Sequence, residues 1–218
     1  MSKITDYSFL FQSMFGTSKT NTTGTFELSQ LNSSSVQAQL KAAGIDTSSK
    51  QYQAVMQSMS AACKGVGYTN IQAIKNRMSR YDSDGDYISP VTGMAGLVVT
   101  EKNRAEKEKI ISIPESSKDE MFELTKQEFL RENGVGNGDT TKRSDVYLNL
   151  YRKMDKNDRL AAGNTLRQYE RAYTQAFVNA VKAVDPKWKP GKPIPAGALD
   201  GITRESVENQ RKSVDMKV

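Results

Sequence analysis

The sequence predicts a mainly α-helical fold: a multi-helix single domain with at most one short two-stranded β element and a flexible, Ser/Thr/Asn-rich N-terminal segment. Apolar residues recur every three or four positions over most of the chain, which is the spacing of one helix face. Glycine or proline stands where several of these stretches would end. By composition the chain divides into residues 1–35, 36–185 and 186–218.

The first 35 residues combine an amphipathic stretch with a polar one. Tyr7, Leu10, Phe11 and Met14 share one helical face. We expect this helix to belong to the core, with a docking peptide as the alternative. Residues 17–35 are rich in Ser, Thr and Asn and are predicted to form a flexible linker or an irregular surface excursion.

The middle of the chain is predicted to hold most of the helices. Their apolar stripes run through residues 36–43, 52–63, 71–80, 121–130, 146–154 and 160–184. Two β-prone stretches, 97–99 and 110–113, are expected to be the strands of the one small sheet. Thr203 can cap a last short helix, which would end near residue 212.

The stretch YDSDGDYISPVTGMAGL, residues 81–97, is the strongest candidate for a site. Asp82, Asp84 and Asp86 alternate, as do the aspartates at positions one, three and five of an EF-hand calcium loop, where a backbone carbonyl binds at position seven. The carbonyl of Ile88 stands at that seventh position. The sequence therefore predicts a Ca²⁺ site formed by these three carboxylates and the Ile88 carbonyl.

The remainder of the loop departs from the EF-hand pattern. Tyr87 stands where glycine is expected, and Gly93 replaces the closing glutamate, so Glu101 or another distant carboxylate would have to complete the shell. The alternatives are magnesium or manganese, and a metal-free Asp-Gly turn whose carboxylates accept backbone hydrogen bonds. Asp-Ser-Asp also resembles the metal-binding DxD of glycosyltransferases, but the chain lacks their alternating strands and helices.

Composition excludes several chemistries. The chain contains no histidine, which removes the usual general base near neutral pH, the common zinc ligand and every Ser-His-Asp arrangement. A single cysteine rules out an intrachain disulfide. The net charge of +6 comes from basic residues mostly interleaved with acidic ones, a pattern typical of solvated helix faces. We therefore favour a protein that is not an enzyme.

Two further segments have alternative interpretations. The segment PKWKPGKPIPAG contains the only tryptophan, Trp188, between Lys187 and Lys189. It either wraps back with Trp188 as an anchor or presents a basic, aromatic arm to a partner. The loop NGVGNGD, residues 133–139, is favoured as a helix-to-helix turn over a phosphate site, because a helix and not a strand precedes it.

No apolar run approaches the roughly 20 residues that span a bilayer, and no signal peptide is evident, so we expect a soluble, cytoplasmic protein unless a signal-independent route exports it. The stretches DYSFLFQSMFG, YDSDGDYISPVTGMAGL, ENGVGNGDTTKRSDVY and LAAGNTLRQYERAYTQAF resemble an uncharacterised family from clostridia and related Gram-positive bacteria, a domain of unknown function. The resemblance covers most of the chain. It implies a bacterial protein outside the housekeeping set and transfers no activity.

Three functions are compatible with these patterns. The leading hypothesis is a non-enzymatic interaction or structural protein, with a protein partner, whose loop from Asp82 to Ile88 is stabilised by calcium. The first alternative is a nucleic-acid or polyanion-binding module that uses Lys187, Trp188, Lys189, Lys192 and the C-terminal basic residues. The second is a metal-dependent hydrolase or transferase built on the same aspartates, which would need a deep pocket beside Asp84.

Overall fold

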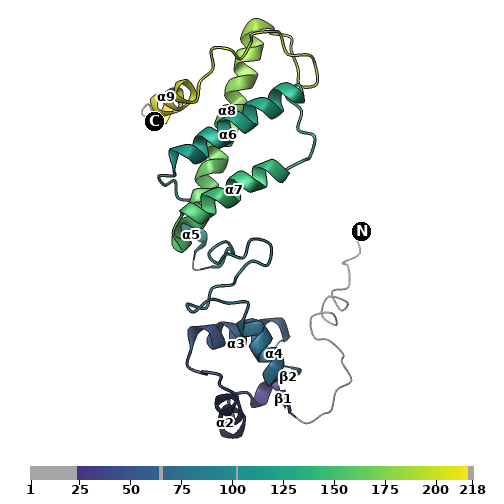
Figure 1. Cartoon of the computed structure of the whole chain (residues 1–218), viewed down its shortest axis with the longest axis vertical. Helices are drawn as coiled ribbons and strands as arrows, with labels where there is room; N and C mark the ends of the chain where they lie inside the picture. The colour runs from purple at the N-terminus through teal and green to yellow at the C-terminus, as the bar shows by residue number, and fades with distance from the viewer. Residues whose placement is uncertain (1–23, 64–65, 102, 216–218) are drawn as a thin grey trace. The chain divides into compact units, whose positions relative to one another are not determined.

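The computed structural model describes residues 24–63, 66–101 and 103–215 (Figure 1). Within these residues the fold is mainly α, as predicted, with eight α-helices, two short 3-10 helices and one two-stranded antiparallel sheet. The elements form two compact units, which divide between Gly85 and Asp86, inside the Asp-rich loop. The amphipathic helix predicted from Tyr7, Leu10, Phe11 and Met14 lies outside the described residues.

The first unit encloses a small apolar core between helices and sheet. Its elements are β1 (Thr25–Glu27), η1 (Leu28–Gln30), α2 (Ser34–Ala42), α3 (Lys50–Cys63), β2 (Tyr68–Asn70) and α4 (Ile71–Met78). The buried side chains that form the core are Phe26, Leu31, Val36, Leu40, Ile45, Tyr52 and Ile74. Ser33 caps α2 and Asn70 caps α4, because each side chain accepts a hydrogen bond from the first turn.

The position of the sheet differs from the prediction. Residues 97–99 and 110–113 are irregular, and the strands are β1 and β2, with Phe26 opposite Thr69. Phe26 is buried between two exposed neighbours, which is the alternation of a half-buried strand. With three residues, β1 is too short for this alternation to be recognised in the sequence. Residues 97–99 lack this burial, since Val98 and Val99 are exposed. The predicted linker at 17–35 thus contains regular structure from Thr25 onward.

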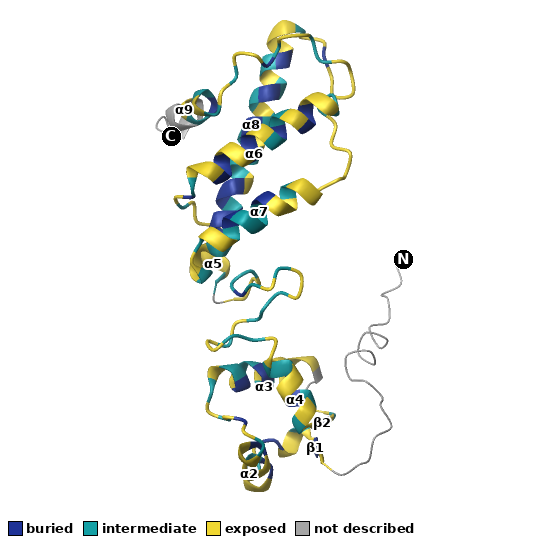
Figure 2. Cartoon of the chain, in the orientation of Figure 1, coloured by how far each residue is buried: buried dark blue, intermediate teal, exposed yellow. Residues whose placement is uncertain are grey.

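The second unit is a helical bundle. Its elements are α5 (Arg104–Lys107), α6 (Glu115–Arg131), α7 (Thr141–Lys153), η2 (Lys156–Asp158), α8 (Arg159–Val184) and α9 (Arg204–Asp215). The long α8 packs against α6, α7 and α9, and its buried positions follow one face (Figure 2). Aromatic rings of α6 and α8 meet at the centre, where Phe122 lies 5.1 Å from Tyr173 and 5.5 Å from Phe177.

Described residues of the C-terminal segment pack into this bundle. Trp188, Leu199 and Val207 are buried in the same apolar cluster as the aromatic rings of α6 and α8. Residues 186–203 therefore return the chain to the bundle before α9 begins. The helices of the described residues lack an apolar stretch of membrane-spanning length.

Candidate metal centre: the Asp-rich loop

The start of the Asp-rich loop is fixed to α3. The side-chain amide of Gln51, in the first turn of α3, donates hydrogen bonds to the carbonyl oxygens of Met78 (2.9 Å) and Tyr81 (2.7 Å). These two carbonyls lie where α4 ends and the loop begins. One side chain therefore positions the first aspartate of the loop relative to α3.

The loop turns tightly over the same helix. Asp82 Oδ1 accepts a hydrogen bond from the backbone N–H of Asp84, and the Asp82 carbonyl accepts one from Gly85, each at 3.0 Å. Gly85 has φ +84°, and a Cβ on it would lie 2.8 Å from the carbonyl oxygen of Lys50. Glycine is required here both for the left-handed backbone and for the close approach to α3.

The turn brings the three predicted aspartates together. Asp82, Asp84 and Asp86 each offer a carboxylate oxygen, and these oxygens all lie within 4.8 Å of one another. Asp82 is half-buried, whereas Asp84 and Asp86 are exposed. Among the described residues, this is the one group of acidic, histidine or cysteine side chains close enough to hold a metal ion together. Glu101, predicted as a further ligand, does not belong to it.

Two lysines partly offset the negative charge of this group. Lys156 Nζ lies 2.7 Å from Asp86 Oδ2, and Lys50 Nζ lies 3.8 Å from Asp84 Oδ1. Sequence reasoning did not identify these lysines, nor Gln51. No spacing pattern could have revealed them, because each lysine is distant in the sequence from the aspartate that it contacts.

Trp188 has the anchoring role that was one of the two interpretations of its segment. The side chain is 2% exposed, its ring centroid lies 5.9 Å from that of Phe129, and its Nε1 donates to the Lys192 carbonyl at 2.9 Å. The indole is therefore not available for stacking on a base. Lys187 and Lys189 are exposed. Of the three residues predicted to bind a partner, Trp188, Lys187 and Lys189, the two lysines are therefore on the surface and the tryptophan is not.

A charged network attaches α9 to α6 and α8. Arg204 bonds Glu115 and Glu208, Lys118 Nζ lies 2.7 Å from Glu115, and Tyr173 donates to Glu208 at 3.0 Å. Hydrogen bonds from Lys118 and Arg204 lower the pKa of Glu115. Burial opposes the charge of Lys118, but the bond to Glu115 and the charge of Glu208 raise its pKa. These mutually paired groups therefore attach α9 to α6 and α8.

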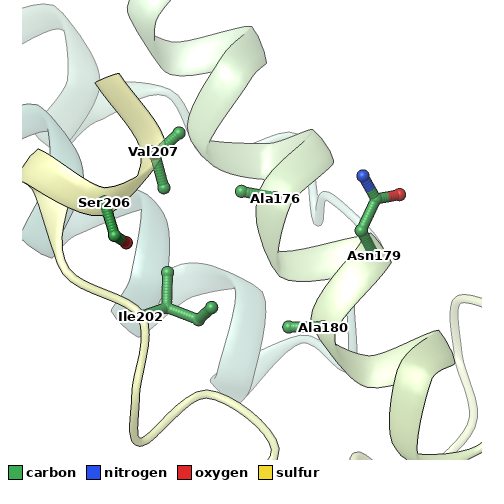
Figure 3. Close-up of a pocket in the computed structure, with 6 residues that line it drawn as sticks. All are labelled: Ala176, Asn179, Ala180, Ile202, Ser206 and Val207. Atoms are coloured by element: carbon green, nitrogen blue, oxygen red, sulfur yellow. The ribbon is translucent and has the colours of Figure 1, made fainter. Parts of the chain in front are cut away.

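Two shallow cavities lie beside α9. The first, of about 250 Å³, has Ala176 and Ala180 of α8 facing Ile202 and Val207 (Figure 3). Its hydroxyl, from Ser206, donates to the Thr203 carbonyl. The second, of about 490 Å³, lies between α6 and residues 200–205 and is lined mostly by charged side chains. Neither is lined by a residue of the Asp-rich loop, and the first has no base beside its hydroxyl.

The fold and the loop define a class: a mainly helical protein of two compact units with an exposed acidic turn. Residues 45–218 match the family model of a domain of unknown function, DUF3879, and the chain belongs to this family. The matched range begins after α2 and includes the Asp-rich loop and the whole second unit. This confirms the resemblance to a family without an assigned activity. No curated protein and no solved structure matches the chain.

Proposed function

We propose that this protein is a non-enzymatic interaction or structural protein whose loop from Asp82 to Ile88 is stabilised by calcium. The convergence of the three carboxylates supports the calcium site. Three oxygens at the corners of a triangle with 4.8 Å edges lie 4.8/√3, or about 2.8 Å, from its centre. Calcium bonds oxygen at about 2.3–2.6 Å, so small side-chain rotations bring all three onto one ion.

Electrostatics favours an added cation at this loop. Two unit charges about 4 Å apart interact by about 1 kcal/mol in water and by about 4 kcal/mol at the effective dielectric of a protein surface. Each pair of these carboxylates repels by an energy in that range. Lys50 and Lys156 each pair with one of these carboxylates, and the pair made by Lys50 is weakened by solvent because its side chain is largely exposed. A divalent cation at the centre of the triangle attracts all three carboxylates and so opposes their mutual repulsion.

Calcium suits the donor set better than magnesium. Magnesium requires near-ideal octahedral geometry, whereas calcium accepts roughly six to eight oxygens in irregular arrangements. The exposed carboxylates leave room for water ligands, and the Ile88 carbonyl is the further protein ligand that we propose. Because no bidentate glutamate closes the loop, we expect a Kd of about 10⁻⁵–10⁻³ M, toward the weaker end of the range for calcium loops.

A structural role for the ion follows from its surroundings. The Asp84 carboxylate is 58% exposed. A metal-dependent hydrolase or transferase needs a cleft that holds substrate beside its ion, and neither of the two cavities beside α9 reaches this loop. With no histidine in the chain, we propose that the bound ion orders the loop and that a protein partner recognises the folded chain.

Calorimetric titration of chelator-treated protein with calcium and with magnesium tests this proposal. We expect calcium to bind more tightly than magnesium and to raise the melting temperature. Calcium at 100 times its Kd stabilises the folded state by about 2.7 kcal/mol. If neither heat nor a shift in melting temperature appears at millimolar calcium, the calcium site is wrong.

Matched variants separate the site from general charge effects. Asp84→Asn keeps the shape of the side chain and removes one ligand charge, so the Kd should rise at least about tenfold. Asp145→Asn removes one exposed charge from α7 and should leave the Kd unchanged. Lys156→Met removes the cation beside Asp86 and should tighten calcium binding severalfold, since one nearby unit charge is worth about 1 kcal/mol in water.

A further inference from the structure

The loop between α6 and α7 contains two Asn-Gly pairs, Asn133–Gly134 and Asn137–Gly138. In such a pair the backbone nitrogen of glycine can attack the side-chain carbonyl carbon of asparagine, because glycine has no Cβ to hinder the approach. The two pairs have the same chemistry and nearly the same sequence position. Their structural surroundings differ.

The first pair is held in the end of α6. Asn133 has φ +51° and is half-buried, and its carbonyl accepts a hydrogen bond from the Gly191 N–H at 2.8 Å. The Gly134 N–H, which would supply the attacking nitrogen, donates to the Phe129 carbonyl at 2.8 Å. The Gly134 backbone also lies against the Trp188 ring. The attack would require this helix end to open.

The second pair is exposed on both residues. Within the residues that the structure describes, the Gly138 amide donates no hydrogen bond. Asn137 Oδ1 accepts a hydrogen bond from the Asp139 N–H at 2.8 Å. This bond polarises the side-chain carbonyl, and it closes a ring that contains both the Asn137 Cγ and the Gly138 nitrogen. The side chain that carries the target carbon is therefore restrained beside the backbone of Gly138 and Asp139.

We infer that Asn137 is a site of spontaneous deamidation, whereas Asn133 in the same loop is protected by the fold. The Gly138 nitrogen bonds to the Asn137 Cγ, the Cγ–Nδ2 bond breaks, and ammonia leaves with the amide proton. Water then opens the resulting succinimide at either carbonyl, which gives aspartate or isoaspartate. The proposal is independent of calcium binding and of any partner.

The modification would alter the start of α7. Glu132 accepts a hydrogen bond from the Asn137 N–H at 2.9 Å, and Asp139 accepts one from Thr141 at 3.0 Å. A new carboxylate at position 137 would lie between these two acidic side chains and repel both. Isoaspartate would also lengthen the backbone by one carbon. We expect faster hydrogen exchange in the first turn of α7 after the conversion.

Incubation of the full-length protein at mildly alkaline pH, followed by peptide mass spectrometry, tests the inference. Asn137 should convert about tenfold faster than Asn133 in the folded protein, the factor that one retained hydrogen bond can provide. In urea the two sites should convert at similar rates, because the protection of Asn133 is lost. Labelling by an isoaspartyl methyltransferase gives an independent readout.

Asn137→Gln provides the matched variant, because its longer side chain would have to close a less favourable six-membered ring. The variant should lose the acidic species that ion-exchange chromatography resolves in the aged protein. Equal rates at the two asparagines in the folded protein would overturn the inference. So would conversion at neither site in the folded protein when both convert in urea.

Discussion

Replacing Trp188 by alanine should destabilise the second unit strongly. The side chain is buried, packs on Phe129 and covers Gly134, and its Nε1 donates to the Lys192 carbonyl. Truncation of a large buried aromatic side chain to alanine typically costs about 3–5 kcal/mol. Single domains are stable by only about 5–15 kcal/mol, so this one substitution removes a large part of the stability.

Urea unfolding followed by circular dichroism measures the loss, and hydrogen exchange locates it. We expect faster exchange in α6 and α8, whose aromatic rings share the core with Trp188. Trp188→Phe keeps a ring in the core but loses the N–H donor and part of the volume. It should cost about 1–2 kcal/mol, the usual range for one lost buried hydrogen bond with limited repacking.

The same series separates the anchor from the basic arm. If Trp188 served a partner and not the core, Trp188→Ala would change the unfolding free energy by less than about 1 kcal/mol. That result would refute the packing argument. Lys189→Ala is the surface control and should stay within about 0.5 kcal/mol of the unmodified protein.

Two further predictions concern the same unit. Gly134→Ala should lower the free energy of unfolding, measured in urea, by about 1–3 kcal/mol. The reason is that Gly134 has φ +75° and that a Cβ on it would lie 2.8 Å from the Trp188 ring. Gly136→Ala is the control and should change the stability little, because a Cβ there meets open space. Burial and the charge of Glu208 raise the pKa of Tyr173. The stability that this shift contributes is complete below the pKa of about 10 that tyrosine has in the unfolded chain, and it is lost as pH rises above that value. Urea unfolding at several pH values should therefore show that Tyr173→Phe loses less stability than the unmodified protein between pH ~9 and ~11.

Helices were predictable from the sequence because their signal is local and repeated. The apolar stripes at 52–63 and 160–184 coincide with α3 and α8, since three or more turns place many side chains on one face. The strands were not predictable by the same method. β1 and β2 have three residues each and are stabilised by pairing across about forty intervening residues, so neither has a pattern of its own. Val98 and Val99 have high β propensity, but both side chains are exposed, so they lack the packing on a half-buried surface that stabilises a strand.

The acidic part of the candidate site was predictable because adjacent aspartates must converge in a tight turn. Its electrostatic surroundings were not. Lys50 and Lys156 approach the loop through long-range folding, and Gln51 fixes the loop through backbone carbonyls, which are the same in every sequence. The local sequence therefore predicts that the three aspartates come together. It does not predict which positively charged side chains from other parts of the chain pair with them.

That distinction is why the Asp-rich loop, and not another acidic group, is the candidate for an added cation. Glu128 is 5% exposed, and its carboxylate lies 2.7 Å from Arg143 Nε; Arg143 also bonds Glu170 at 2.9 Å. In this half-buried network the cation is the Arg143 guanidinium, which already bonds both carboxylates. An external ion would first have to break those ion pairs. The loop carboxylates are mostly exposed, and the lysines beside them are single point charges. Of the two acidic groups, the loop is therefore the one whose carboxylates a cation can approach directly from solvent.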